Sequence, residues 1–328
     1  MGGGTAEVFL TAKGFNVFDI CEVENNDVSI KNKLADYRSD NNIAVVLESD
    51  KYWSKNRKCF EEFGGVVQLF SVMKIFYEVF KPSYREVYDL LEDDLSKEIF
   101  TEVLNVRFKI KSPKVLITYF DSNQYFTLPE MNMFEGDGVF VDCGAFVGDT
   151  VEKFINNCQS VFGKIYAFEP AQRQFNAFNV RRKRLIEEWA LDESKIQLIN
   201  AGVGSKNHEG TMVQGWLDDN NIGRRVSYDK KITNDSTDKI KILALDDVLK
   251  NEKVDFIKSD VEGSEMEMLR GAQNIIITQK PLLALSIYHK LSDYYEIPLY
   301  IKNLVPDYKF KIRHHSTNFM ETVLYCYI

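Results

Sequence analysis

Several hallmarks of secreted, membrane-spanning and zinc-binding proteins are missing from this sequence of 328 residues. Its five cysteines are odd in number, widely spread and without a CxxC pair, which argues against a disulfide framework or a zinc site and is typical of a reducing cytoplasm. No apolar run approaches the roughly 18 residues that a membrane helix needs. The N-terminus, "MGGGTAEVFL", has no basic region followed by an apolar one, and Ala6 stands where a myristoylation motif needs Ser or Thr. We therefore expect a cytoplasmic protein without membrane insertion.

An excess of positive charge is also missing. Lys and Arg number 41 against 49 Asp and Glu, so the formal net charge is −8. This balance disfavours a nucleic-acid partner, because like charges repel the phosphate backbone. The densest basic cluster, "RRKRL" at residues 181–185, is interpreted as the solvated face of a helix.

The pattern along the chain predicts two domains. Residues 1–112 are expected to form a small accessory α/β domain, with a strand at 43–49 and a helix at 50–65 closed by glycines. Apolar and aromatic residues recur at threes and fours from Val66 to Phe80, which predicts a packed helix that Pro82 interrupts. Residues 113–137 are expected to be a connector ending in the turn-rich "FEGDG".

Residues 138–328 alternate between short apolar strands and helical patterns, which is typical of a parallel sheet covered on both faces. The chain ends with two strand-like segments about eight residues apart, a pattern that predicts an antiparallel pair at the sheet edge. The fold class is thus α/β, a doubly wound, Rossmann-like sheet. The expected strands begin at residues 139, 165, 196, 254, 282, 308 and 321.

The stretch "VFVDCGAFVGDT" at residues 139–150 places Asp142, Gly144 and Gly148 in the loop after the first of these strands. Ligands of such sheets bind beyond the carboxyl ends of the strands. The dinucleotide fingerprint G-x-G-x-x-G is absent. A carboxylate at Asp142 would repel a pyrophosphate but suits a ligand with an ammonium or sulfonium group, which favours S-adenosylmethionine.

Two further loops follow neighbouring strands. Glu169 ends the second strand, where a carboxylate accepts hydrogen bonds from both hydroxyls of a ribose. Asn200 and Ala201 end the third strand and are placed to meet the adenine.

The segment "IKSDVEGSEMEMLRGA" at residues 257–272 supplies candidate catalytic groups. Asp260 and Glu262 directly follow the fourth strand. Ser264 and Glu267 have the spacing of a capping box, which assigns them to structure, and Glu265 favours the N-terminus of the helix. Two carboxylates without a third ligand make an unconvincing metal site, so none is predicted.

Three histidines and one insertion complete the candidates. His289 follows the fifth strand, and either it or Asp260 would act as a general base. At most one of His314 and His315 can point inward, since side chains alternate along a strand. The polar insertion from Trp216 to Asp238 is a candidate substrate lid.

Together these motifs resemble the FkbM family of S-adenosylmethionine-dependent methyltransferases over residues 138–328. The most specific part is the combination of DxGAxxGD, at residues 142–149, with KxDVEGxE, at residues 258–265. The resemblance implies a class I methyltransferase fold and methyl transfer to a hydroxyl of a sugar, glycan or secondary metabolite. Phe146 departs from the smaller or polar residue that is more usual in the family.

By position, the resemblance assigns the cofactor to Asp142, Gly144, Ala145, Gly148, Asp149 and Glu169, and the reaction centre to Asp260, Glu262 and His289. Two alternatives are a nicotinamide-dependent oxidoreductase and a non-catalytic module that binds S-adenosylmethionine. The missing dinucleotide fingerprint and the antiparallel C-terminus disfavour the first, and the retained carboxylates disfavour the second. A homodimer is possible from the sequence, which identifies neither the acceptor nor the role of the N-terminal domain.

Overall fold

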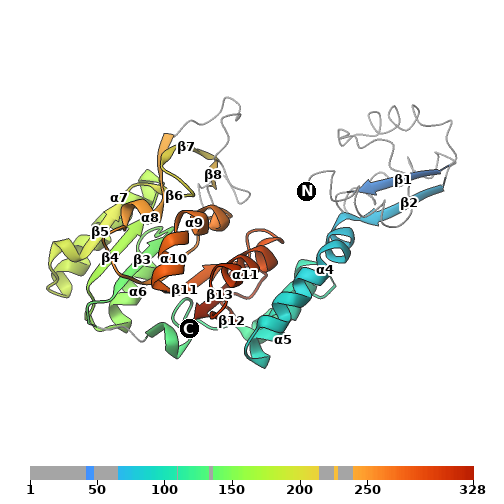
Figure 1. Ribbon diagram of the computed structural model, residues 1–328, viewed down its shortest axis with the longest axis horizontal. Helices are drawn as coiled ribbons and strands as arrows, with labels where there is room; N and C mark the ends of the chain where they lie inside the picture. Colours follow the sequence, from blue (N-terminus) through green and yellow to red (C-terminus); the bar gives the residue numbers. More distant parts are fainter. Residues whose placement is uncertain (1–41, 48–65, 109, 133–135, 214–224, 228–238) are drawn as a thin grey trace. The chain divides into compact units, whose positions relative to one another are not determined.

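The computed structural model describes residues 42–47, 66–108, 110–132, 136–213, 225–227 and 239–328 (Figure 1). The chain divides into two compact units, residues 1–86 and 87–328. Residues 87–112, which the sequence analysis placed in the N-terminal domain, therefore belong to the second unit. They do so because helix α5 (Asp94–Arg107) packs within it, with the ring of Phe100 6.4 Å from that of Tyr294.

In the first unit, the strand expected at 43–49 is present as β1 (Asn42–Leu47), which pairs in parallel with β2 (Val66–Ser71). The prediction of a helix from Val66 to Phe70 was therefore wrong. Short apolar runs fit either structure by periodicity, and here the pairing with β1 decides. The helix predicted at 50–65 lies outside the described residues.

Helix α4 (Val72–Leu90) continues through Pro82, so the predicted interruption is also wrong. Proline cannot donate the hydrogen bond to the carbonyl four residues earlier, and this normally disfavours it inside a helix. Apolar side chains nevertheless continue on both sides of it, with Phe76, Tyr84 and Val87 buried. Burial of this apolar stripe offsets the lost hydrogen bond.

The second unit is built on a seven-stranded sheet in the order β12-β13-β11-β10-β3-β4-β5. All seven predicted strands are found in it, and the predicted doubly wound fold is confirmed. The last strand of the chain lies between two others and runs antiparallel to both. The strand that precedes it in the chain therefore forms the edge of the sheet. The strands in chain order are β3 (Val139–Cys143), β4 (Lys164–Phe168), β5 (Ile196–Ile199), β10 (Val254–Ser259), β11 (Leu282–Ser286), β12 (Lys309–His314) and β13 (Thr322–Tyr327).

Strand order reverses between β3 and β10, which are neighbours in the sheet. From β3 the chain proceeds to β4 and β5 through α6 (Asp149–Asn157) and α7 (Gln172–Glu188). From β10 it proceeds in the opposite direction through α9 (Glu265–Gly271), α10 (Gln273–Gln279) and α11 (Asp293–Leu304). Right-handed crossovers place these two groups of helices on opposite faces (Figure 1). A crevice for a ligand is expected where the order reverses.

A smaller sheet follows β5, in the order β6-β9-β7-β8. Most of the predicted substrate lid, residues 216–238, lies outside the described residues. Of this segment the structure describes only strand β8. The strands are β6 (Gly202–Val203), β7 (His208–Val213), β8 (Arg225–Ser227) and β9 (Lys239–Leu243), and the short helix α8 (Leu245–Val248) comes next. Among the described residues, no helix has the length and hydrophobicity that crossing a bilayer requires.

The connector predicted at 113–137 is part of the core of the second unit. It carries two short 3-10 helices, η1 (Pro113–Tyr119) and η2 (Pro129–Asn132), and the segment between them buries Phe126 completely. The Phe126 ring lies 5.9 Å from the ring of Phe256 on β10 and 6.3 Å from that of Phe140 on β3. This packing fixes the connector against the two central strands.

Replacing Phe126 with alanine should lower the free energy of unfolding by about 3–5 kcal/mol, because it leaves a cavity in the aromatic core. Urea denaturation would measure the change. Phe120→Ala is the matched control: this ring is in the same segment but 49% exposed, and a change within about 0.5 kcal/mol is expected. Equal effects of the two substitutions would show that the connector is not anchored through Phe126.

Candidate active site

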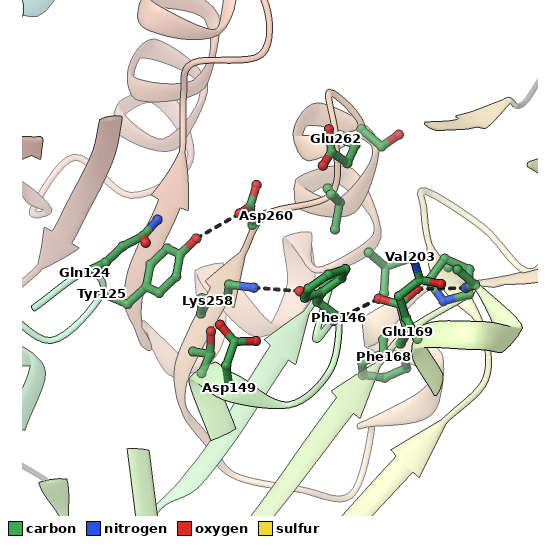
Figure 2. Close-up of a pocket in the computed structure, with 18 of the residues that line it drawn as sticks. Gln124, Tyr125, Phe146, Asp149, Phe168, Glu169, Val203, Lys258, Asp260 and Glu262 are labelled. Carbon is green, nitrogen blue, oxygen red and sulfur yellow. Dashed lines mark hydrogen bonds between the residues drawn. The ribbon is translucent and has the colours of Figure 1, made fainter. Parts of the chain in front are cut away.

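A cavity of about 420 Å³ opens at the carboxyl ends of the central strands (Figure 2). Its volume is in the range of small-molecule sites. The loops after β3, β4, β5, β10 and β11 line it, together with the connector and the residues just before β13. The lining residues used below are Gln124, Tyr125, Gly144, Phe146, Asp149, Glu169, Ala201, Lys258, Asp260, Glu262, Tyr288 and Glu321.

The glycines of the β3–α6 loop are required by close packing. Gly144 has a φ of +78°, and a Cβ atom there would lie 1.9 Å from the carbonyl oxygen of Asp260. Gly148 has a φ of +81°, and its Cβ atom would lie 2.2 Å from the ring of Phe178 on α7. Gly144 therefore lets the β3 and β10 loops meet, and Gly148 lets α6 begin against α7. Gly144 lines the cavity, whereas Gly148 does not.

Glu169 holds this loop in place from the end of β4. Its carboxylate accepts hydrogen bonds from the backbone amides of Phe146, at 2.9 Å, and Ala171, at 2.8 Å (Figure 2). Phe146 has a φ of +48°, an uncommon conformation for a large side chain, and the hydrogen bond that its amide donates to Glu169 stabilises it. Burial raises the pKa of Glu169 to about 7, although these hydrogen bonds oppose the shift.

Asp142 does not face the cavity, contrary to the prediction. Its side chain is fully buried and forms an ion pair of 2.9 Å with the ammonium group of Lys258, the residue beside it on β10. Lys258 also donates a hydrogen bond of 2.7 Å to the carbonyl oxygen of Gly144. Burial lowers the pKa of Lys258, but Asp142 and Asp260 outweigh it and raise the pKa, so the lysine stays charged. The argument that Asp142 faces a cationic ligand therefore fails, because Lys258 already neutralises it.

Of the other predicted cofactor residues, two line the cavity and two do not. Asp149 and Ala201 line the cavity, whereas Ala145 and Asn200 do not. The amide of Ala145 donates to the carbonyl oxygen of Phe168, and the side chain of Asn200 donates to that of Glu169. These two residues shape the loops around the cavity from behind.

Two carboxylates from the β10 loop, Asp260 and Glu262, line the cavity as predicted. Asp260 accepts a hydrogen bond from the hydroxyl group of Tyr125, at 2.9 Å (Figure 2), and another from that of Tyr288, at 3.3 Å. Its side chain is 22% exposed and that of Glu262 is 40% exposed. Glu262 has a φ of +55°, a strained conformation for a residue other than glycine.

His289 lies among three carboxylates. Its Nδ1 atom is 3.0 Å from Glu265, and its Nε2 atom is 3.4 Å from Asp260 and 3.5 Å from Glu262. Burial lowers its pKa, but these carboxylates outweigh it and raise the pKa to about 10. A histidine that is protonated at neutral pH cannot accept a proton, so the prediction of His289 as the general base is not supported.

Glu265 lies in the first turn of α9, as predicted, and has a further role. Its carboxylate is fully buried and accepts hydrogen bonds from the amides of Val261, at 3.1 Å, and Gly263, at 3.3 Å. The predicted capping box is wrong, because Ser264 makes no side-chain capping bond and Glu267 accepts a hydrogen bond from Ser205. Glu265 thus organises both the turn that carries Asp260 and Glu262 and the ring of His289.

Several site residues were missed by the sequence analysis: Gln124, Tyr125, Lys258, Glu265, Tyr288 and Glu321. A lysine inside an apolar strand, as in "DFIKSD", was the one usable signal, because a buried charge needs a partner. The connector residues and Glu321 come from distant parts of the chain and carry no local signal. His314 and His315 are both buried, bonded to Thr322 and Tyr325 respectively, and do not line the cavity.

Comparison with known proteins identifies the class. The family model of the FkbM methyltransferase domain matches residues 142–312, more than half of the chain. The structure is similar to that of the methyltransferase FkbM from Methylobacillus flagellatus, with a TM-score of 0.64 and 22% identity over 91% of this chain and 77% of that one. The chain belongs to the FkbM methyltransferase domain family, as its motifs predicted.

More distant similarities are weaker. Fibrillarin from Aeropyrum pernix, solved with S-adenosylmethionine, has a TM-score of 0.36 and 14% identity over 61% of this chain and 68% of that one. Magnesium protoporphyrin IX methyltransferase from Synechocystis has a TM-score of 0.32 and 12% identity over 78% and 97%. A comparison with curated proteins gives no match.

Replacing Lys258 with methionine should lower the free energy of unfolding by about 3–5 kcal/mol, because it leaves the carboxylate of Asp142 buried without its partner. Urea denaturation would measure this. The double variant Asp142→Asn with Lys258→Met removes both charges and should recover part of the loss. A single variant as stable as the parent protein would contradict the ion pair.

Proposed function

We propose that this protein transfers the methyl group of S-adenosylmethionine to a hydroxyl oxygen of an acceptor, a sugar or glycan. The observation that carries the proposal is a single cavity with two chemically different ends. Glu169 and the β3–α6 loop form one end, and the carboxylates of Asp260 and Glu262 form the other (Figure 2). A nucleoside with a reactive methyl group fits between them, with the acceptor at the carboxylate end.

The residues present fit the cofactor. Glu169 keeps lone pairs beyond those that accept the two amides, which suits the hydroxyls of a ribose. Gly144, Phe146 and Ala201 offer backbone and apolar surface at the same end, and Asp149 offers a carboxylate for an ammonium group. When bound, S-adenosylmethionine supplies an already activated methyl group.

The chemistry left to the protein is alignment and proton removal. S-adenosylmethionine would give its methyl group to the acceptor oxygen and leave as S-adenosylhomocysteine, and the cavity residues would hold the acceptor hydroxyl in line with the sulfur–methyl bond. The hydroxyl proton passes to Asp260, the carboxylate that two tyrosine hydroxyls fix in the cavity. Alignment supplies roughly 7–11 kcal/mol in such reactions. His289 positions Asp260 and Glu262 and takes no proton.

The acceptor end fits a molecule rich in hydroxyl groups. Glu262, Glu321 and Gln124 face it with hydrogen-bonding groups, and Gln124 already donates to Glu321 at 2.6 Å. This polar lining supports a sugar over an apolar acceptor. A cytoplasmic location is part of the proposal, supported by the free thiols of Cys143, Cys158 and Cys326. A homodimer and the lack of a nucleic-acid partner stay predictions.

Calorimetry with S-adenosylmethionine, S-adenosylhomocysteine and NAD tests the cofactor. We expect both sulfur compounds to bind and NAD not to bind. Binding of NAD alone would refute the proposal in favour of an oxidoreductase. Formation of S-adenosylhomocysteine in the presence of a panel of sugars then separates an enzyme from a module that only binds the cofactor.

The affinity for S-adenosylhomocysteine should rise with pH. Glu169, with a pKa near 7, is largely protonated at pH 6 and ionised at pH 8, and only the ionised form accepts both ribose hydroxyls. The dissociation constant should therefore fall about tenfold from pH 6 to pH 8 and level off above that. Calorimetry at each pH measures it. The Glu169→Gln variant should bind more weakly and show no such dependence; a parallel slope in both would assign the titration to another group.

Replacing Asp260 with asparagine should lower the rate of methyl transfer by about 10²–10⁴-fold, because the acceptor proton loses its base. Affinity for S-adenosylhomocysteine should change little. Asp307→Asn is the matched control, since this carboxylate is 68% exposed and outside the cavity. Full turnover by the Asp260 variant would remove Asp260 from the mechanism.

A further inference from the structure

Phe146 is an aromatic residue left open to the cavity. It is 44% exposed and is the only exposed large apolar residue, among those that the structure describes, that lines the cavity. Figure 2 shows its ring between Glu169 on one side and Lys258 and Asp260 on the other. An open ring on a cavity wall offers its face to the ligand that the cavity binds.

The backbone holds this ring in a conformation that phenylalanine seldom adopts. Its φ of +48° lies in the left-handed region, which costs free energy for any residue other than glycine. The amide of Phe146 donates a hydrogen bond of 2.9 Å to the carboxylate of Glu169, which is itself buried and also accepts the amide of Ala171. The carboxylate that we assign to the ribose therefore also fixes the residue that carries the ring.

The order of the strands decides which part of the cofactor meets Phe146. Four neighbouring strands follow in the order β10-β3-β4-β5, and the loops after them line the cavity. Ala201 follows β5 and is assigned to the adenine, Glu169 follows β4 and is assigned to the ribose, and Asp260 follows β10 at the acceptor. In S-adenosylmethionine the sulfonium group lies between the ribose and the methyl group that is transferred. The loop between Glu169 and Asp260 is the one that carries Phe146, so the sulfonium group would lie at this loop.

The carboxylates around this loop are already engaged. Asp142 forms a buried ion pair of 2.9 Å with Lys258, and Glu169 accepts two backbone amides. Asp149, in the first turn of α6, is the group that we assign to the ammonium of the cofactor. The face of a phenyl ring is electron-rich and attracts a cation at close range. The open ring of Phe146 therefore supplies the attraction for a sulfonium that these carboxylates do not.

We propose that the ring of Phe146 faces the sulfonium group of S-adenosylmethionine and makes the protein prefer the charged cofactor over its neutral product. The inference rests on the proposed function and deepens it. S-adenosylhomocysteine carries no charge on sulfur, so the attraction ends when the methyl group leaves, and release of the product is favoured. Because the charge on sulfur declines on the way to the transition state, the ring acts on cofactor affinity rather than on the chemical step.

Calorimetry of the full chain with S-adenosylmethionine and S-adenosylhomocysteine tests the proposal through the ratio of the two dissociation constants. Phe146→Leu keeps an apolar side chain but removes the electron-rich face. We expect it to lower the preference for S-adenosylmethionine about three- to tenfold, while the affinity for S-adenosylhomocysteine stays within about twofold of the parent's. Phe146→Tyr keeps an aromatic face and should retain the preference. Phe120→Leu is the matched control, because this ring is 49% exposed but does not line the cavity.

An unchanged ratio in Phe146→Leu would overturn the inference, whether both ligands bind as before or both lose affinity equally, because the ring is then only an apolar wall. A rise in the KM of the acceptor sugar with an unchanged ratio would assign the ring to the acceptor instead. Since Phe146 is 44% exposed and leucine meets the same strain at this φ, the variant is expected to fold, and a thermal melt checks this. A parent protein that binds neither ligand refutes the proposed function itself, whereas normal binding with an unchanged ratio in the variant removes only the role of Phe146.

Discussion

The buried ion pair between Lys258 and Asp142 joins the two central strands at the point where strand order reverses. Because burying one charge without the other is costly, each residue requires its partner, and the register of β10 against β3 follows from their pairing. The same ammonium group donates to the carbonyl oxygen of Gly144 and so fixes the first turn of the neighbouring loop. The floor of the cavity is therefore set by an interaction that no ligand needs to supply.

Three carboxylates around this floor have different tasks because their surroundings differ. Glu169 accepts two amides and shapes the loop on the cofactor side. Glu265 is fully buried, accepts two amides and faces a histidine, so it supports the site without entering it. Asp260 is partly exposed and accepts hydrogen bonds from two hydroxyl groups, a setting that suits the proton-accepting role we propose for it. Residue type alone does not distinguish these roles. The burial of each carboxylate and the hydrogen-bond donors around it do.

The strands and the Rossmann-like class could be predicted because they depend on local patterns. Apolar runs alternating with amphipathic helices specify a parallel sheet wherever they occur. The segment at Val66 was misread because a run of six residues fits a strand or a helix equally well, and only its partner β1 distinguishes them. Pro82 was misread because local propensity was outweighed by burial along the rest of α4.

By itself the sequence determined the motifs, their order and the family, since DxGAxxGD and KxDVEGxE can be recognised without coordinates. It also placed Glu169, Asp260 and Glu262 in loops at the same edge of the sheet. The tertiary structure alone decided which carboxylate is neutralised and that Tyr125 reaches Asp260. These facts depend on contacts between residues more than a hundred positions apart, and pairing, burial and pKa have no signature in the local order of residues.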